Sequence, residues 1–236
     1  MSGTLRQLVV VIPARNEEQL LPRCLASVRE AMAALTCRRP DLLAGITVVL
    51  DRTADGSARI VRQSPGTVGL RCQAGNVGRA RDLGVRRALR LAGLPGSAVW
   101  IANTDADSTV PRDWLCTHAE IADAGWDVLV GTVQPERSDL SEAALAAWLA
   151  AHQLGEGHPH IHGANLGFRA DVYTRLGGFR RHQVHEDRDF VRSAAAAGFR
   201  LLTTDQCRVT TSGRSQSRVR GGFADYLGAE RAGNAS

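Results

Sequence analysis

Residues 98–108 read Ala98-Val99-Trp100-Ile101-Ala102-Asn103-Thr104-Asp105-Ala106-Asp107-Ser108, an apolar run that ends in two acids one residue apart. In an extended strand, residues i and i+2 point to the same side with Cα atoms roughly 6 to 7 Å apart, so a turn at the strand end can aim both carboxylates at one cation. Such hard oxygen ligands suit Mg²⁺ or Mn²⁺, and a divalent ion in turn suits a diphosphate. Taken alone, an Asp-x-Asp is more typical of a solvated turn with an Asx hydrogen bond.

Two earlier apolar runs also end at polar turns. Leu8 to Ile12 stops at Pro13, and Ile46 to Leu50 stops at Asp51. Continuous β-branched runs of this length are typical of strands that are buried on both faces of a sheet. In an open parallel sheet the ligand crevice lies outside the carboxyl ends of the strands, so we expect the three turns to line one site.

Helical patterns alternate with these strands and predict an α/β fold, a mostly parallel twisted sheet flanked by helices. The expected helices begin at an N-cap Asn16 with Glu17 and Glu18 in the first turn, after a Gly-rich loop at 75–84, at Pro111, over 140–154, over 171–176 and at 185–189. Further extended segments are expected at 127–133, 164–169 and 200–211.

The composition favours one domain and a small anionic ligand. A chain of 236 residues with 44% hydrophobic content can build one large α/β core. The formal charge is +5, but all 29 basic residues are Arg and they are not interleaved with aromatic residues, so we expect no nucleic-acid partner. The absence of Lys excludes a Schiff-base lysine and a Walker-type phosphate lysine.

The cysteines and the hydropathy predict a cytoplasmic protein without a transmembrane segment. The chain has an odd number of cysteines, and they are far apart with no CxxC pair, which favours reduced thiols. The polar start of the chain does not read as a signal peptide, and no apolar stretch approaches the 18 or so residues of a membrane span. The cysteines are Cys24, Cys37, Cys72, Cys116 and Cys207.

The order of the motifs resembles that of the family 2 glycosyltransferases, which have the GT-A fold. The resemblance covers roughly residues 8 to 205, and the collinear set is far more specific than any one motif. It is carried by 10–17, 48–57, 76–84, the Asp-x-Asp at 104–108, Gly163-Ala164-Asn165 with Gly177-Gly178-Phe179, and Glu186-Asp187. It implies a single GT-A domain over 1–236, with a nucleotide-binding half at 8–110, an acceptor half at 111–211 and a polar tail at 212–236.

The resemblance implies a donor site in the first half. Asp51 would accept a hydrogen bond from the ring N–H of a uracil-like base, but Leu50 stands where the family often has a second acid, so the base stays open between UDP and GDP. Arg81 would lie near the diphosphate, where a guanidinium is well suited, or would be an ordinary surface arginine of a helix. The residues that would frame the base and ribose are Pro13, Ala14, Arg15 and Glu17.

The same resemblance assigns the metal and the acceptor side. Asp107 would bind Mg²⁺ or Mn²⁺ directly, and Asp105 would contact the ribose or reach the metal through water. Asp187, with Glu186 beside it, would be the general base, and the sequence leaves open which of the two acts. Acids at a helix N-terminus can also serve stability alone.

The acceptor pocket is expected at His162, Gly163, Ala164 and Asn165. The alternation of His158, His160 and His162 could bind zinc on an extended segment, but a solvated or acceptor-contacting histidine loop is favoured.

The expected function is metal-dependent transfer of a hexose from a UDP- or GDP-linked donor to an acceptor hydroxyl, with inversion favoured. The acceptor could be a small molecule, a glycan or a lipid-linked molecule. A retaining GT-A transferase of the glucosyl- or mannosyl-glycerate type remains an alternative, as does a non-catalytic nucleotide-binding module. A nucleotidyltransferase is disfavoured, because such enzymes commonly use Lys with a Gly-rich loop and this chain has no Lys.

Overall fold

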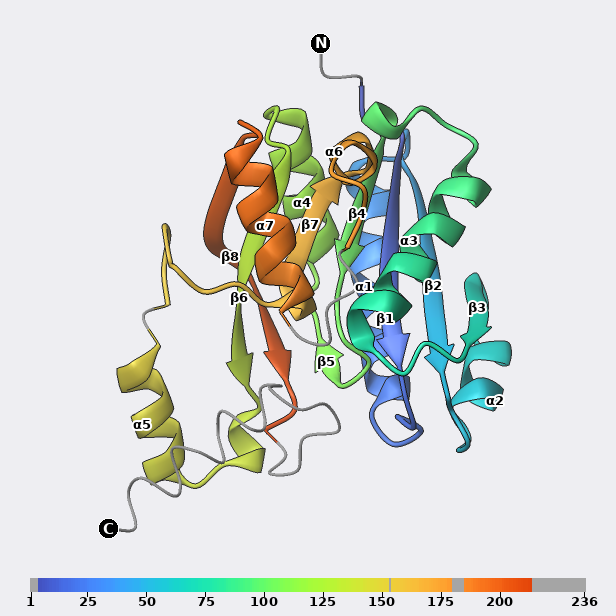
Figure 1. The fold of residues 1–236 in the computed structure, drawn as a ribbon. Coiled ribbons are helices and arrows are strands. Elements are labelled where there is room, and N and C mark those ends of the chain that lie inside the picture. The colour runs from blue at the N-terminus through green and yellow to red at the C-terminus, as the bar shows by residue number, and fades with distance from the viewer. Residues whose placement is uncertain (1–3, 153, 180–184, 214–236) are drawn as a thin grey trace.

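The computed structural model describes residues 4–152, 154–179 and 185–213. Within these ranges the strands form one eight-stranded sheet in the order β3-β2-β1-β4-β7-β6-β8-β5 (Figure 1). The strands are β1 Gln7–Ala14, β2 Leu43–Asp51, β3 Thr67–Cys72, β4 Val99–Asn103, β5 Ser108–Thr109, β6 Val128–Pro135, β7 Leu166–Arg169 and β8 Leu201–Thr211.

The sheet is mostly parallel, as the sequence predicts. Strand β1 pairs in parallel with β2 and β4, β2 with β3, and β6 with β8. Strand β7 is antiparallel to both β4 and β6, and β5 is antiparallel to β8. Six strands of the sheet therefore point the same way and end at one edge, and that edge carries Asp51 and the turn after β4.

Helices cover both faces of the sheet. The α-helices are α1 Leu21–Arg38, α2 Ser57–Arg62, α3 Val77–Ala92, α4 Trp114–Asp123, α5 Glu142–Ala151, α6 Ala170–Arg175 and α7 Glu186–Ala196, and short 3₁₀ turns lie at Gly96–Ala98, Arg137–Asp139 and Gly163–Asn165. Helices α1 and α4 pack on one face, whereas α3, α6 and α7 pack on the other (Figure 1).

The alternation of side chains along β1 explains why its apolar run is continuous. Val10 and Ile12 belong to the core under α1 and α4, whereas Val9 and Val11 belong to the core under α3 and α7. Because successive side chains of a strand point to opposite faces, a strand covered on both sides needs apolar residues at every position.

Two helix starts differ from the expectation. Helix α1 begins at Leu21, because Asn16 adopts a left-handed conformation (φ 55°) and its Oδ1 accepts a hydrogen bond from the Ala54 N–H at 2.8 Å. Asn16 therefore joins the turns after β1 and β2 instead of capping a helix. Helix α4 begins at Trp114 after Asp113, three residues later than Pro111.

Two further differences concern α5 and the tail. Helix α5 is shorter than the expected 140–154, and it begins where Ser141 Oγ accepts a hydrogen bond from the Ala144 N–H at 3.2 Å. Residues 214–236 of the expected polar tail, where the sequence predicts a helical patch near 223–227, lie outside the described residues. Among the helices that are described, none has the length and apolarity to cross a bilayer.

Candidate active site

Hydrogen bonds join the turns after β1 and β2 at the edge of the sheet where the six parallel strands end. The Glu17 N–H donates to Ser57 Oγ at 2.9 Å, and Glu17 itself is buried. Pro13 and Ala14 are buried at the end of β1, whereas Arg15 is exposed. The four residues expected to frame a nucleotide base thus lie at the end of β1 and in the turn that follows it, which Ser57 holds in place.

Asp51 binds the loop between β3 and α3 at the same edge of the sheet. It is buried at the end of β2, and its Oδ1 accepts a hydrogen bond from the Gly75 N–H at 3.0 Å. Gly75 has φ 67°, and a Cβ there would lie 2.6 Å from the Arg52 guanidinium carbon, so glycine is required for the approach. Asp51 therefore holds the segment that leads into α3 against the end of β2.

The two acids of the Asp-x-Asp have different surroundings. Asp105 Oδ1 forms an ion pair with Arg81 Nη2 at 2.5 Å. Asp107 is half-buried, and its Oδ1 lies 3.4 Å from the hydroxyl oxygens of Ser108 and Thr211. Because Thr211 ends β8, the pairing of β5 with β8 positions the turn that carries Asp107.

The chemistry of this turn fits a hard divalent ion that is shared with a ligand. No group of three or more His, Cys, Asp or Glu side chains within the described ranges is placed to hold a metal by itself. Asp107 offers carboxylate oxygens among hydroxyl groups, which are the ligands that Mg²⁺ and Mn²⁺ accept. Mg²⁺ in particular is often bound by one or two carboxylates together with substrate phosphates.

Arg81 is buried, with 4% exposure, and is not the surface arginine that the sequence left as an alternative. Its Nη2 contacts Asp105 and its Nη1 forms an ion pair with Glu186 Oε1. Burial lowers the pKa of the guanidinium, but the negative charges of Asp105 and Glu186 more than offset this, and the pKa is raised above its ordinary value. Arg81 is therefore a permanently charged group at the centre of the site.

Glu186 and Asp187 diverge at the start of α7, as adjacent side chains of a helix do. Glu186 is buried against α3, and burial raises the pKa of its carboxyl while the charge of Arg81 acts in the opposite direction. Asp187 Oδ2 accepts a hydrogen bond from the Gly163 N–H at 2.8 Å. Glu186 thus faces Arg81 of α3, and Asp187 faces the turn at Gly163.

The side chain of Asn165 points into the core. It is fully buried, and its Oδ1 accepts a hydrogen bond from Trp114 Nε1–H at 3.0 Å. Its amide nitrogen donates to the carbonyl oxygens of Thr132 and Cys207, each at 2.8 Å. These contacts give the side chain a structural role, and the acceptor contact expected of it stays a prediction.

The histidine segment is packed, contrary to the expected flexible loop. His158 is buried, and its Nε2 must carry the proton, because it faces the carbonyl oxygens of Val130 at 3.1 Å and Thr204 at 3.3 Å. The rings of His158, His160 and His162 stack at centroid distances of 6.1 and 6.2 Å. Burial, with the neighbouring histidines, lowers the pKa of His162 to about 3, so the ring is neutral at pH 7.

Trp148 is fully buried and stacks on His152 at 4.3 Å, which is the core packing that its apolar surroundings in the sequence favour. One feature of the site was not expected from the sequence. Gly78, in the first turn of α3, lies against Glu186, and a Cβ there would be 2.5 Å from Glu186 Cγ. A glycine inside a helical pattern was the available signal for such a close approach.

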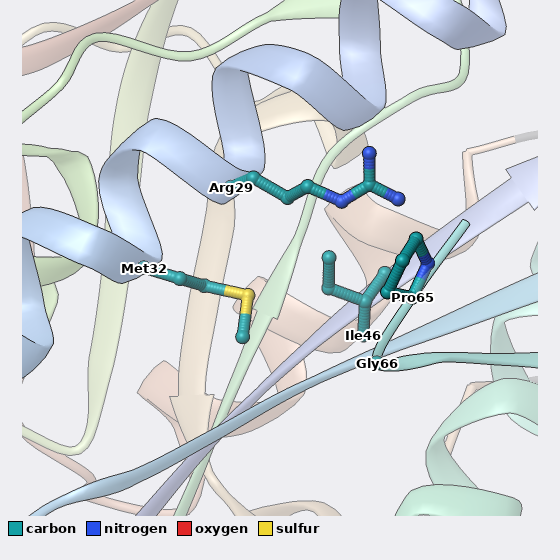
Figure 2. A pocket seen from close by; sticks show the side chains of 5 residues that line it. All are labelled: Arg29, Met32, Ile46, Pro65 and Gly66. Carbon is teal, nitrogen blue, oxygen red and sulfur yellow. The ribbon is translucent and has the colours of Figure 1, made fainter.

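A shallow pocket of about 350 Å³ lies elsewhere (Figure 2). Arg29 and Met32 of α1 face Ile46, Pro65 and Gly66 across it. Ile46 lies in the first half of β2 and Gly66 precedes β3, so the pocket is near the amino ends of these strands. It is separate from the edge that carries Asp51 and Asp105.

Comparison with known proteins agrees with this architecture. One similar solved structure is S. aureus TarS 1-349, with a TM-score of 0.63 and 14% identity over 88% of this chain and 60% of that one. A second is the mannosyltransferase PcManGT from Pyrobaculum calidifontis in complex with GDP-Man and Mn²⁺, with a TM-score of 0.63 and 19% identity over 97% of this chain and 70% of that one. A third is GalNAc-T7 with UDP, GalNAc and Mn²⁺, with a TM-score of 0.64 and 16% identity over 92% of this chain and 45% of that one. These similarities show a GT-A fold.

The chain spans only part of some of these neighbours, namely 60% of TarS 1-349 and 42% of a longer TarS structure. No curated protein sequence matches the chain. The family model of glycosyl transferase family 2, however, matches residues 9–177, which is more than half of the chain. The protein therefore belongs to glycosyl transferase family 2, as its motifs indicated.

Proposed function

We propose that the protein transfers a hexose from a UDP- or GDP-linked donor to an acceptor hydroxyl, in a metal-dependent displacement that inverts the anomeric centre. One observation carries the proposal: Asp105 of the donor-side turn and Glu186 at the start of α7 bind the same guanidinium, that of Arg81. A donor held at the first of these segments would thus present its sugar next to the acids of the second.

The donor would lie along the carboxyl edge of the sheet. Pro13, Ala14, Arg15 and Glu17 would frame the base and ribose, and Asp51 would accept a hydrogen bond from the base. In support, these residues occupy the turns after β1 and β2, which hydrogen bonds join to one another. The mannosyltransferase crystallised with GDP-Man and Mn²⁺ and GalNAc-T7 crystallised with UDP and Mn²⁺ share this fold.

The divalent ion would be held by Asp107, with Asp105 beside it and diphosphate oxygens completing its shell. When bound, Mg²⁺ or Mn²⁺ would supply Lewis-acid stabilisation of the departing nucleoside diphosphate. The Ser108 and Thr211 hydroxyls would hold the Asp107 carboxylate in place, since both lie 3.4 Å from its Oδ1.

The acceptor would enter beside His162 and the turn formed by Gly163, Ala164 and Asn165. A carboxylate of the pair Glu186 and Asp187 would take the hydroxyl proton while the acceptor oxygen bonds to the anomeric carbon and the bond from that carbon to the phosphate oxygen breaks. His162 is neutral at pH 7, so its ring can donate or accept a hydrogen bond without adding charge. The acceptor would be a small molecule, a glycan or a lipid-linked molecule.

We also propose that residues 1–236 act as one GT-A domain with donor and acceptor halves at 8–110 and 111–211, and that it works in the cytoplasm. The first proposal is supported by the continuous sheet, to which both halves contribute strands. The second is supported by the thiols, because all five cysteines are free.

Incubation of the protein with UDP- and GDP-hexoses and Mn²⁺ tests the proposal. We expect slow hydrolysis of one donor, seen as released nucleoside diphosphate and stopped by EDTA. Once an acceptor is found, an α-linked donor should give a β-linked product in the NMR spectrum, and retention would identify the retaining alternative. Tight nucleotide binding without turnover of any donor would instead indicate a binding module.

A further inference from the structure

We propose that Arg81 is a positioning residue and not a phosphate ligand: its guanidinium fixes Asp105, Glu186 and the turn at Gly163 relative to one another. Its effect on donor binding rests on the proposed function, whereas the clamp formed by Arg81 does not.

The contacts of Arg81 show a clamp between distant segments. The guanidinium binds Asp105 in the turn after β4 through Nη2 and Glu186 in α7 through Nη1. The side chains of Arg81 and Glu186 are 5% and 3% exposed, so water cannot replace either partner. A bidentate guanidinium fixes both the distance and the orientation of two carboxylates, which a lysine could not do.

Two glycines allow the clamp to close. A Cβ at Gly163 would lie 2.3 Å from Arg81 Nη1, so the guanidinium packs directly on the backbone of the acceptor-side turn. A Cβ at Gly78 would lie 2.5 Å from Glu186 Cγ, so the glutamate packs directly on the first turn of α3. Any side chain at either position would push the ion pair apart.

The clamp reaches Asp187 through Gly163. The backbone N–H of Gly163 donates to Asp187 Oδ2 at 2.8 Å, and the same residue touches the guanidinium of Arg81. Asp187 is therefore oriented by a segment whose position Arg81 sets. Glu186 is held inside the protein by its own ion pair, whereas Asp187 lies at the acceptor-side turn.

The local charge argues against a phosphate role for Arg81. The carboxylates of Asp105, Glu186 and Asp187 all stabilise its charged form, so three acids surround one guanidinium. The single positive charge of Arg81 is outweighed by the negative charges of these three carboxylates. A diphosphate placed here would therefore be repelled until a divalent ion is bound. Compensation of the diphosphate is therefore assigned to the metal at Asp107.

A double-mutant cycle tests the clamp. Arg81→Gln leaves Glu186 buried and uncompensated, and we expect its melting temperature to fall by roughly 10 °C. Arg81→Gln combined with Glu186→Gln should recover at least half of that loss, because the buried charge is then gone. Arg90→Gln, at an exposed arginine in the last turn of α3, is the matched control and should change the melting temperature by less than about 2 °C. Additive losses at Arg81 and Glu186 would overturn the clamp, and this result needs no ligand.

Nucleotide affinity distinguishes a clamp from a phosphate ligand. Dissociation constants of UDP and GDP with Mn²⁺ are measured at a temperature at which every variant is folded. We expect Arg81→Gln to weaken binding roughly tenfold and the double variant to regain most of it. If the double variant binds as weakly as Arg81→Gln, Arg81 is a phosphate ligand and the proposal is wrong. If wild type binds neither nucleotide, the proposed function fails while the unfolding cycle still decides the clamp.

Discussion

Trp114 and Asn165 are joined inside the protein by a hydrogen bond of 3.0 Å from the indole N–H to the amide oxygen. Both side chains have no exposed surface. Trp114 is the first residue of α4, and Asn165 is the last residue of the 3₁₀ turn Gly163–Asn165. The hydrogen bond therefore fixes this turn to α4. A residue of the family's acceptor motif is therefore a structural anchor in this chain.

Asn165→Ala should lower the free energy of unfolding by about 3 to 5 kcal/mol. The substitution leaves the Trp114 N–H and the carbonyl oxygens of Thr132 and Cys207 buried without their partner, and each such group costs about 1 to 3 kcal/mol. Urea unfolding measures the change. Gln63→Ala, at an exposed site after α2, is the control and should stay within about 0.5 kcal/mol. A stable Asn165→Ala protein that had lost only acceptor affinity would restore the acceptor role.

The strands that carry the site could be predicted from sequence because their apolar runs are long and continuous. β1, β2 and β4 lie in the middle of the sheet, and the acids that follow them are at its carboxyl edge. β3 was missed because it is an edge strand whose side chains are only partly buried. Its apolar residues Val68, Leu70 and Cys72 alternate with polar or small ones, but over six residues this is a weaker signal than a continuous apolar run.

The ion pairs of the site could not be predicted, because their partners are far apart in the sequence. Arg81 is 24 residues from Asp105 and 105 residues from Glu186. Its motif indicated a phosphate contact or a surface arginine, and local sequence carries no signal for burial between two acids. Likewise, only the fold shows that Gly78 lies under Glu186 and that Asn165 is inside the core.

Gly78→Ala should destabilise the protein by about 1 to 3 kcal/mol, although glycine to alanine inside a helix normally stabilises by about 1 kcal/mol. The sign reverses because the new methyl would lie 2.5 Å from Glu186 Cγ, which the ion pair with Arg81 holds in place. Gly45→Ala is the control, since nothing lies within 4 Å of a Cβ at that position. Thermal unfolding compares the two, and a more stable Gly78→Ala protein would show that Glu186 is not fixed.

The stability of the protein should fall as the pH is lowered below about 6.5, partly because of His118. Burial lowers the pKa of this ring to about 3, while the unfolded chain binds a proton near the ordinary value. The unfolded state therefore takes up more protons between about pH 6.5 and 3, which costs the folded state about 1.4 kcal/mol per pH unit for this ring. His162 acts in the same direction.

Urea unfolding at pH 7, 6, 5 and 4 tests this dependence in wild type and His118→Gln. Glutamine can still accept the hydrogen bond that Trp100 Nε1–H donates to His118 Nδ1 at 2.8 Å, but it does not titrate. The slope of stability against pH should be smaller in His118→Gln by about 1.4 kcal/mol per unit in the middle of this window, between about pH 5.5 and 4. Equal slopes would mean that the ring is protonated inside the folded protein.

Removal of the metal should abolish nucleotide-induced stabilisation. A nucleoside diphosphate at 100 times its dissociation constant stabilises the folded state by about 2.7 kcal/mol, which moves the melting temperature visibly. With Mn²⁺ present we expect this shift for UDP or GDP in wild type, its loss with EDTA, and its reduction in Asp107→Ala. Both acids of the turn are half-buried, but Asp105 is already paired with Arg81, so Asp107 is the one to test.

Asp113→Ala is the matched control for Asp107→Ala, because Asp113 is exposed and its side chain does not cap α4. It should keep the full shift with Mn²⁺. A shift that persists in EDTA would mean that the protein binds the diphosphate without a divalent ion, and the compensating charge would then have to come from arginine side chains. Because Arg81 faces two carboxylates already, such a result would move attention to Arg15, the exposed arginine of the turn after β1.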